Sequence, residues 1–293
     1  MNSKASLEKE STPLVRLTTI DSLTIYAKLE NRNPSGSIKY RTISRILEDA
    51  TITGELKHNM NLIEISSGNT GIALALRGGE LNHPVTIITL KDATEESKKM
   101  IRGYGAELIE VNGWYSDGEK IIKDIMNKEP GKWFWTKQVT NKSSLASNFN
   151  LGLEINKQFS VLFGGSIDIY LASVSTGSTL SGVGAALKKV NPKTIIYRVL
   201  PDIAYKYPGV DDEDVSTVPL SLYNKNLVDK RIRIKEIDAI NAAKELYNIY
   251  SHDVGISAGA DFAAAKSIAK TEKGNAVIIF PDSRNRYISV LRA

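Results

Sequence analysis

The segment LIEISSGNTGIALAL (62–76) joins a short apolar run, a small polar loop and an apolar helical run. The run Leu62–Ile65 predicts a strand, and the loop after it leads into the start of a helix. Such a loop can form an anion site, because backbone N–H groups and hydroxyls converge at a helix N-terminus. Ser67, Asn69 and Thr70 could bind a carboxylate. A plain structural turn explains this segment equally well on its own.

The same alternation of strand and helix continues along the chain, and it predicts an α/β fold with largely parallel sheets. The helix predicted after Ser37 has an apolar stripe made by Ile43, Ile46, Leu47 and Ala50. The predicted strands are Leu62–Ser66, Val85–Leu90, Leu108–Val111, Ile167–Val174, Thr194–Leu200, Arg231–Lys235 and Ala276–Phe280.

A second polar loop, STGSTLSGVG (175–184), follows the strand Ile167–Val174. It suits a phosphate, since several backbone N–H groups and hydroxyls can donate together. Charge-assisted bonds of this kind contribute roughly 1.5–3 kcal/mol each. The loop lacks the GK[ST] of a P-loop and the GxGxxG of a dinucleotide site.

The segment NPSGSIKYR (33–41) places Lys39 in the first turn of a helix for which Ser37 is the expected N-cap. The positive end of the helix dipole disfavours a cation there, which lowers the pKa and favours a free amine. A solvated surface lysine is the better interpretation of this segment taken alone. A last segment, FPDSRNRY (280–287), follows a strand end and places Ser283 in a turn.

Composition excludes several classes of protein. The chain has no cysteine, which rules out disulfides and thiolate chemistry, and His58, His83 and His252 lack metal-ligand spacing. The net charge is only +5, and basic residues alternate with acidic ones, so neither nucleic acid nor a membrane surface is an expected partner. The polar N-terminal segment MNSKASLEKES (1–11) does not resemble a signal peptide, and we expect a cytoplasmic protein.

Taken together, the segments resemble the fold-type II pyridoxal-phosphate enzymes, and within them the cysteine synthase (O-acetylserine sulfhydrylase) family, closest to its B-type branch. The matching motifs follow one another over essentially the whole chain: TPLVRL (12–17), AKLENRNPSGSIKYR (27–41), EISSGNTGIALA (64–75), RGYGAELIEV (102–111), STGSTLSGVG (175–184), PGV (208–210), NLVDK (226–230), VGISAGA (254–260) and PDSRNRYIS (281–289).

The resemblance implies two three-layer α/β domains with mostly parallel twisted sheets, like the tryptophan synthase β-subunit. A smaller, mobile substrate-binding domain is expected over residues 42–147. Residues 1–41 and 148–293 would form the larger cofactor-binding domain. A homodimer is expected by the same resemblance.

The resemblance also assigns the site. Lys39 would hold pyridoxal 5'-phosphate as a Schiff base, Asn69 would lie beside the ring oxygen, and Ser283 would bond the pyridine nitrogen. A neutral serine leaves the ring a weaker electron sink, which suits β-elimination. The cofactor phosphate would be bound by Ser175, Thr176, Gly177, Ser178 and Thr179. The substrate would be bound by Ser66, Ser67, Gly68, Asn69, Thr70 and Gln138. No metal is expected.

The implied reaction is β-replacement on an O-activated L-serine (O-acetylserine or O-phosphoserine) through an α-aminoacrylate, with sulfide adding to give L-cysteine. Lys39 would remove the α-proton. A serine or threonine dehydratase, a cystathionine or diaminopropionate synthase, and a non-catalytic binding protein with the same fold remain alternatives. The sequence also departs from the family pattern, since Gly78 and Gly79 would interrupt a helix. The acidic tract Asp211–Asp214 is better interpreted as a solvated loop; the alternative is a specificity role in which it would disfavour a phosphorylated donor.

Overall fold

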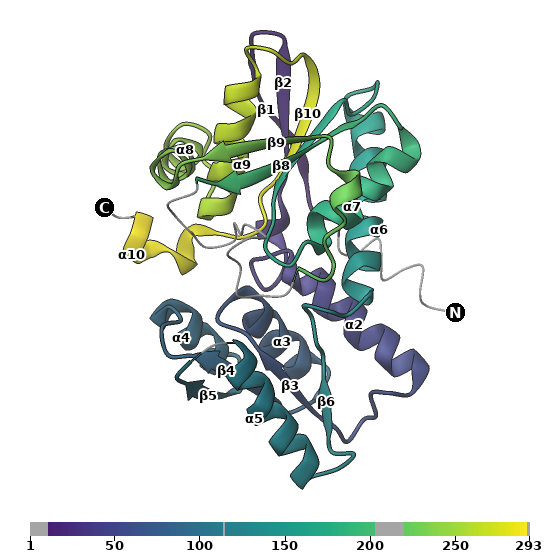
Figure 1. Cartoon of the computed structure of the whole chain (residues 1–293), viewed down its shortest axis with the longest axis vertical. Helices are drawn as coiled ribbons and strands as arrows, with labels where there is room; N and C mark the ends of the chain where they lie inside the picture. The colour runs from purple at the N-terminus through teal and green to yellow at the C-terminus, as the bar shows by residue number, and fades with distance from the viewer. Residues whose placement is uncertain (1–10, 114, 203–219, 292–293) are drawn as a thin grey trace.

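The computed structural model describes residues 11–113, 115–202 and 220–291, and it contains two parallel or mostly parallel sheets in two lobes (Figure 1). The acidic tract Asp211–Asp214 and the PGV motif (208–210) lie outside the described residues. Two α/β domains with mostly parallel sheets confirm the predicted fold class.

The larger sheet has the strand order β1-β2-β10-β7-β8-β9. β1 and β2 form an antiparallel hairpin, and the other pairings are parallel. Its strands are β1 (Leu14–Ile20), β2 (Leu23–Lys28), β10 (Gly274–Ile279), β7 (Ile169–Ser173), β8 (Ile195–Pro201) and β9 (Lys230–Ile234). Both faces are apolar because helices cover both, as a parallel sheet requires.

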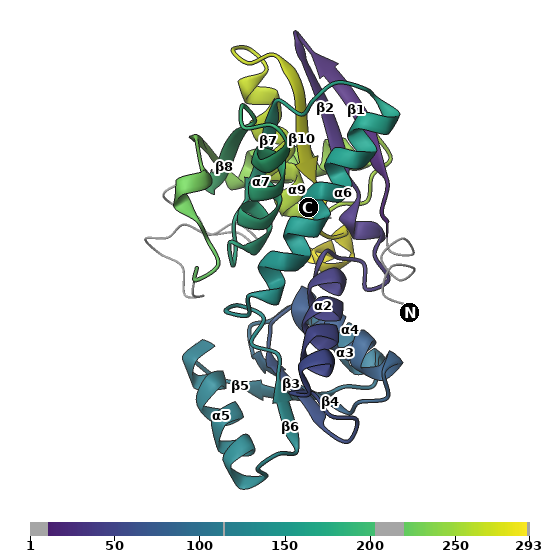
Figure 2. The same ribbon diagram turned by 90° about the vertical axis from the view of Figure 1, so that its right-hand side faces the viewer.

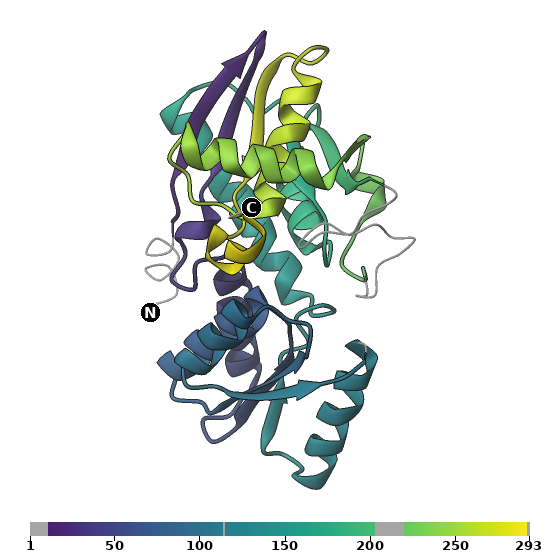
Figure 3. The ribbon, with the colours of Figure 1, turned by 90° about the vertical axis from the view of Figure 1, so that its left-hand side faces the viewer.

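Helices α6 (Ser143–Leu162) and α7 (Ser178–Val190) pack on one face of this sheet (Figure 2). Helices α8 (Glu236–Asn248) and α9 (Ile256–Ile268) cover the opposite face (Figure 3). Residues 143–148 form the first turns of α6. The C-terminal α10 (Ile288–Leu291) follows the short 3-10 helix η3 (Arg284–Arg286).

The smaller sheet is fully parallel, with the order β5-β4-β3-β6. Its strands are β5 (Glu107–Val111), β4 (Val85–Leu90), β3 (Asn61–Ile65) and β6 (Trp133–Trp135). α5 (Tyr115–Lys128) covers one face. The other face is covered by α2 (Lys39–Thr53), α3 (Asn69–Glu80) and α4 (Glu95–Gly103).

The predicted apolar stripe of α2 is confirmed, because Ile43, Ile46, Leu47 and Ala50 are all buried. The predicted helix break at Gly78–Gly79 is wrong, since α3 runs through both residues. A Cβ on Gly78 would lie 2.3 Å from a methyl group of Val85, so this glycine allows the helix to pack closely on β4. Across the described residues, no helix is long and apolar enough to span a membrane.

Candidate active site

A cavity of about 690 Å³ opens where the carboxyl ends of strands from both sheets meet. Open α/β sheets bind ligands at this edge. The predicted site residues that line the cavity are Lys39, Ser66, Ser67, Gly68, Asn69, Thr70, Gln138, Ser175, Thr176, Gly177 and Thr179. Four separate segments of the sequence therefore meet in one place.

Lys39 is the first residue of α2. Its Nζ donates to Oε1 of Gln138 at 3.3 Å. Burial lowers the pKa of Lys39 to about 8, and the Glu64 carboxylate acts against that shift. A large fraction of the amine is therefore neutral near pH 8, as a nucleophile or general base requires.

The predicted N-cap role of Ser37 is wrong. The residue at the N-cap of α2 is Ile38, and no side chain caps this helix. The Ser37 hydroxyl lies 3.4 Å from that of Ser35, while the Ile38 N–H donates to the carbonyl of Pro281 at 2.8 Å. This backbone bond fixes the start of α2 to the end of β10, and so it positions Lys39 at the cavity.

Some polar groups of the loop before α3 stabilise the start of that helix, and others lie at the cavity. The Ser66 hydroxyl accepts the N–H groups of Gly71 (2.9 Å) and Gly68 (3.2 Å), so it stabilises the start of α3. The Ser67 side chain is exposed. The Thr70 hydroxyl donates to Oε1 of Gln138 at 2.9 Å, which brings this loop and Lys39 to the same amide oxygen.

A buried carboxylate that the sequence interpretation missed, Glu64, fixes Gln138. It accepts the N–H groups of Ile65 and Gln138, each at 2.8 Å. It also accepts the Trp135 indole N–H and the Thr136 hydroxyl. Burial raises the pKa of Glu64, and these four donors act in the opposite direction. Glu64 therefore links β3 to the segment that carries Gln138.

The loop before α7 has the form of a phosphate site. Gly177 has φ +88°, and a Cβ there would lie 2.4–2.6 Å from atoms of Tyr223, so only glycine fits. Ser178 begins α7 and is buried. Its hydroxyl lies 3.3 Å from that of Thr176 and 3.4 Å from Nδ2 of Asn148, and Ser178 is not part of the cavity lining.

Ser283 also lies outside the lining. Its hydroxyl donates to Oδ1 of Asn285 (2.8 Å) and accepts from Nη1 of Arg286 (3.2 Å). The serine hydroxyl that does reach the cavity on this side belongs to Ser257, in the first turn of α9. Its signal was the VGISAGA motif (254–260), from which no site residue was taken.

Three buried polar atoms beside the cavity have no hydrogen-bond partner among the described residues: Oδ1 of Asn69, Nε2 of Gln138 and Oδ1 of Asp282. Nδ2 of Asn69 donates to Oδ2 of Asp282 at 2.7 Å, which joins the two lobes. Unpaired buried polar atoms are costly in a native protein and are explained when a ligand pairs with them. With the phosphate-type loop and the half-buried Lys39, they fit a phosphorylated aldehyde together with an amino-acid carboxylate.

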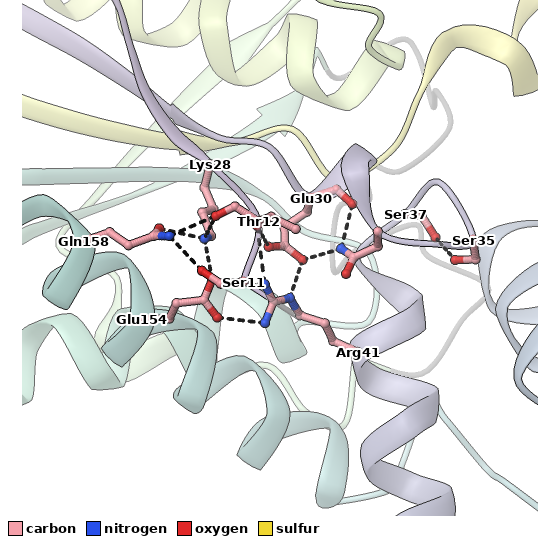
Figure 4. Close-up of polar contacts among 10 residues, drawn as sticks. Ser11, Thr12, Lys28, Glu30, Ser35, Ser37, Arg41, Glu154 and Gln158 are labelled. Atoms are coloured by element: carbon pink, nitrogen blue, oxygen red, sulfur yellow. Dashed lines mark hydrogen bonds and ion pairs between the residues drawn. The ribbon is translucent and has the colours of Figure 1, made fainter. Parts of the chain in front are cut away.

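A second polar cluster lies behind the first turn of α2 (Figure 4). Arg41 donates from Nε to Glu30 and from Nη1 to Glu154, each at 2.8 Å. Lys28 donates to Glu154 and, at 2.7 Å, to Oε1 of Gln158. Burial acts to raise the pKa of Glu154, but Arg41 and Lys28 outweigh it and hold the pKa below its usual value. The cluster ties β2, α2 and α6 together.

The fold and cavity define an enzyme that binds a phosphorylated cofactor beside a reactive lysine. The chain matches the family described as "Pyridoxal-phosphate dependent enzyme" over residues 5–282 and belongs to that family. Its cofactor is pyridoxal 5'-phosphate. In the described residues no cluster of three His, Cys, Asp or Glu side chains could hold a metal.

Comparison with known proteins agrees with this assignment. The chain is 32% identical over 295 residues to a cysteine synthase of Aquifex aeolicus (strain VF5), covering 95% of this chain and 88% of that protein. It superposes on an O-ureido-L-serine synthase with a TM-score of 0.87, at 26% identity and 96% and 92% coverage of the two chains. It also superposes on a hydrogen sulfide-producing enzyme from Fusobacterium nucleatum with a TM-score of 0.87. The sequence identity to that enzyme is 27%, and the superposition covers 95% of both chains.

Proposed function

We propose that the chain is a cysteine synthase, which replaces the β-substituent of O-acetyl-L-serine with sulfide to give L-cysteine. The observation that carries this proposal is the meeting of Lys39 and Thr70 at Oε1 of Gln138. It places a proton-accepting amine next to groups suited to an amino-acid carboxylate. The cysteine synthase relatives and the small-molecule substrates of the family support the same reaction.

Different residues would bind the substrate and accept its proton. Nε2 of Gln138, the exposed Ser67 hydroxyl and the N-terminus of α3 bind the substrate carboxylate. That contact directs the α-hydrogen toward Lys39, whose Nζ takes the proton because burial has lowered its pKa. The cofactor, when bound, withdraws electrons from the α-carbon and so makes that proton acidic.

The remaining predicted residues hold the cofactor. Ser175, Thr176 and Thr179, with the backbone N–H groups around Gly177, bind its phosphate. Asn69 would lie beside the ring, and Lys39 would bind the aldehyde. Ser257 replaces Ser283 in our assignment of the ring-nitrogen contact, because Ser257 is in the cavity lining and Ser283 is held by Asn285 and Arg286. When substrate binds, residues 42–147 move toward the larger domain and exclude water.

The donor is identified by presenting the holoenzyme separately with O-acetylserine, O-phosphoserine and serine, each with and without sulfide. We expect O-acetylserine to change the absorbance of the bound cofactor fastest and to yield cysteine only when sulfide is present. Pyruvate without cysteine would indicate a dehydratase. A cofactor band that is absent from wild type, or that Lys39→Ala leaves unchanged, would indicate a binding protein instead of an enzyme.

A homodimer is part of the proposal. The exposed side chains of Val161 and Leu162, at the end of α6, and of Val190, at the end of α7, provide apolar surface on the larger domain. Sedimentation equilibrium of the purified protein tests this, and Val161→Glu with Leu162→Lys should shift the distribution toward monomer.

A further inference from the structure

A buried aspartate, Asp261, lines the cavity and has no role in the mechanism above. It lies one helical turn after Ser257 on α9, and both side chains line the cavity together with Ser173 at the end of β7. Residues four apart on a helix lie on the same face. Asp261 is 2% exposed and Ser257 is 5% exposed.

The surroundings of Asp261 do not neutralise a charge. Its Oδ1 accepts the N–H of Ser173 at 2.8 Å, and the Ser173 hydroxyl also hydrogen-bonds to the carboxyl. No ion pair in the described part of the chain includes Asp261. The hydroxyl of the fully buried Tyr170, which interacts electrostatically with Asp261, has no hydrogen-bond partner in the part of the chain that the structure describes. Burial raises the pKa of Asp261 well above its usual value, against the hydrogen bonds from Ser173, and so favours the neutral form of the carboxyl. A protonated carboxyl can donate a hydrogen bond.

Part of this arrangement has a structural explanation. The pairing of β7 with β10 covers only Ile169 and Tyr170 on β7, so the Ser173 N–H beyond it needs another acceptor. Asp261 supplies one oxygen for that purpose. An amide or hydroxyl would serve as well, at far lower cost than a buried acid, and so the ionisable group remains unexplained.

The chemistry of the cofactor identifies a partner for this acid. In pyridoxal phosphate the ring nitrogen lies opposite the aldehyde carbon. With the aldehyde at Lys39 and the phosphate at residues 175–179, the nitrogen faces lining residues other than those of α2. The polar side chains that α9 and the end of β7 contribute to the lining are Ser257, Asp261 and Ser173.

We propose that Asp261 is a further cofactor-binding residue whose carboxyl proton is shared with, or transferred to, the pyridine nitrogen alongside the Ser257 hydroxyl. The transfer balances, since the O–H bond of the carboxyl breaks, an N–H bond forms, and carboxylate and pyridinium remain as an ion pair. The ring then withdraws electrons more strongly than one bonded to a serine alone. This inference rests on the cofactor placement proposed above.

The test compares two ligands on the apo-protein. One is pyridoxal 5'-phosphate, and the other is its 1-deaza analogue, in which a C–H replaces the ring nitrogen. Asp261→Asn keeps an oxygen for the Ser173 N–H but cannot supply the proton. We expect wild type to bind pyridoxal phosphate about tenfold more tightly than the analogue, and Asp261→Asn to remove most of that preference by weakening only the nitrogen-containing ligand.

A purely structural role predicts a different pattern, because the variant would then lose affinity for both ligands equally or for neither. Either result overturns the inference while leaving the proposed function in place. Asp261→Ser, which keeps an acceptor and relieves burial of the acid, is the second variant should Asp261→Asn fail to fold. The ¹⁵N chemical shift of bound labelled cofactor provides an independent measurement, and it should move toward the unprotonated value in either variant. Absence of any Lys39-dependent cofactor band in wild type overturns both proposals.

Discussion

Two polar clusters lie on either side of the first turn of α2, and they differ in how completely their groups are paired. Behind the turn, charged side chains pair with one another: Glu154 accepts from both Arg41 and Lys28, and Arg41 also pairs with Glu30 (Figure 4). In front of it, around Lys39, the buried Nε2 of Gln138 and Oδ1 of Asn69 have no hydrogen-bond partner within residues 11–113, 115–202 and 220–291. Only one residue separates Lys39 from Arg41 in sequence.

The difference shows what each cluster does. A paired buried cluster can complete its hydrogen bonds within the folded chain, and removing one partner leaves another charge stranded. An unpaired cluster costs folding free energy until a ligand supplies the missing partners. The cluster around Arg41 is therefore expected to control stability, while the groups around Lys39 control chemistry. Substitutions at four residues of these two clusters, Lys39, Arg41, Gln138 and Gln158, test that division.

The largest effect is expected from Lys39→Ala. Its loss removes the attachment point of the cofactor and the proton acceptor, and general-base catalysis alone contributes about 10²–10⁴-fold. We expect kcat/KM for cysteine formation to fall by about 10³-fold or more, with the cofactor absorbance band altered. The exposed Lys99→Ala on α4 is the matched control and should retain wild-type kinetics. Wild-type turnover in Lys39→Ala would remove Lys39 from the mechanism.

The next effect concerns stability. Arg41→Ala leaves Glu30 and part of Glu154 without their cation, and breaking such a buried pair costs about 3–5 kcal/mol of unfolding free energy. Urea denaturation of the apo-protein measures it. Arg45 provides the control, because it lies one turn later on the same helix and pairs with Asp49 near the surface. Arg45→Ala should cost about 0–1 kcal/mol. Equal losses in the two variants would contradict the distinction between the clusters.

Two glutamines sharpen the comparison. Gln158 accepts from Lys28 and donates to the Thr12 carbonyl at 3.0 Å, whereas Nε2 of Gln138 is unpaired. Gln138→Met should raise KM for the amino-acid donor by about 10–100-fold, since a charge-assisted bond to its carboxylate is lost. Gln158→Met should lower stability and leave KM unchanged. Steady-state kinetics and urea unfolding on both variants give the answer, and a reversed pattern would refute the assignment.

The sequence predicted the parts of this molecule whose causes are local. Periodicity located the apolar stripe of α2, and the strand-loop-helix pattern found the loops at residues 66–70 and 175–179. The short hairpin β1–β2 was missed, since its residues alternate weakly and its burial comes from β10. The residue type of Ser37 predicts a helix cap, but the backbone hydrogen bond of Ile38 to Pro281 determines that helix start.

The site residues that were missed act over long distances in sequence. Glu64 is an ordinary strand residue until Trp135, Thr136 and Gln138 fold over it. Ser257 and Asp261 lie in an alanine-rich helix with almost no amphipathic pattern, which gives no sign of the face that lines the cavity. Polar groups whose partners come from distant segments cannot be assigned from spacing alone.

The smallest effect expected is a pH dependence of the apo-protein's stability. In the unfolded chain Lys39 keeps its proton up to pH 10.5, whereas in the folded protein burial lowers its pKa to about 8. Between these values the unfolded state binds more protons, so unfolding free energy rises with pH. Partial exposure of the side chain reduces the gain, and we expect about 1–2 kcal/mol.

Lys39→Met isolates this contribution, because the difference between wild type and variant removes every other titrating group. The unfolding free energy of wild type should increase relative to that of the variant as pH rises from 8 to 10.5. Urea unfolding of the apo-proteins measures both values. Arg41 is expected to differ, because its carboxylate partners raise its pKa against the effect of burial. It therefore stays charged over that interval, and Arg41→Met should show a stability difference that does not change with pH. If the stability difference between wild type and Lys39→Met does not change with pH, burial does not disfavour the charged amine of Lys39. The two clusters would then not differ in how well they stabilise a buried cation.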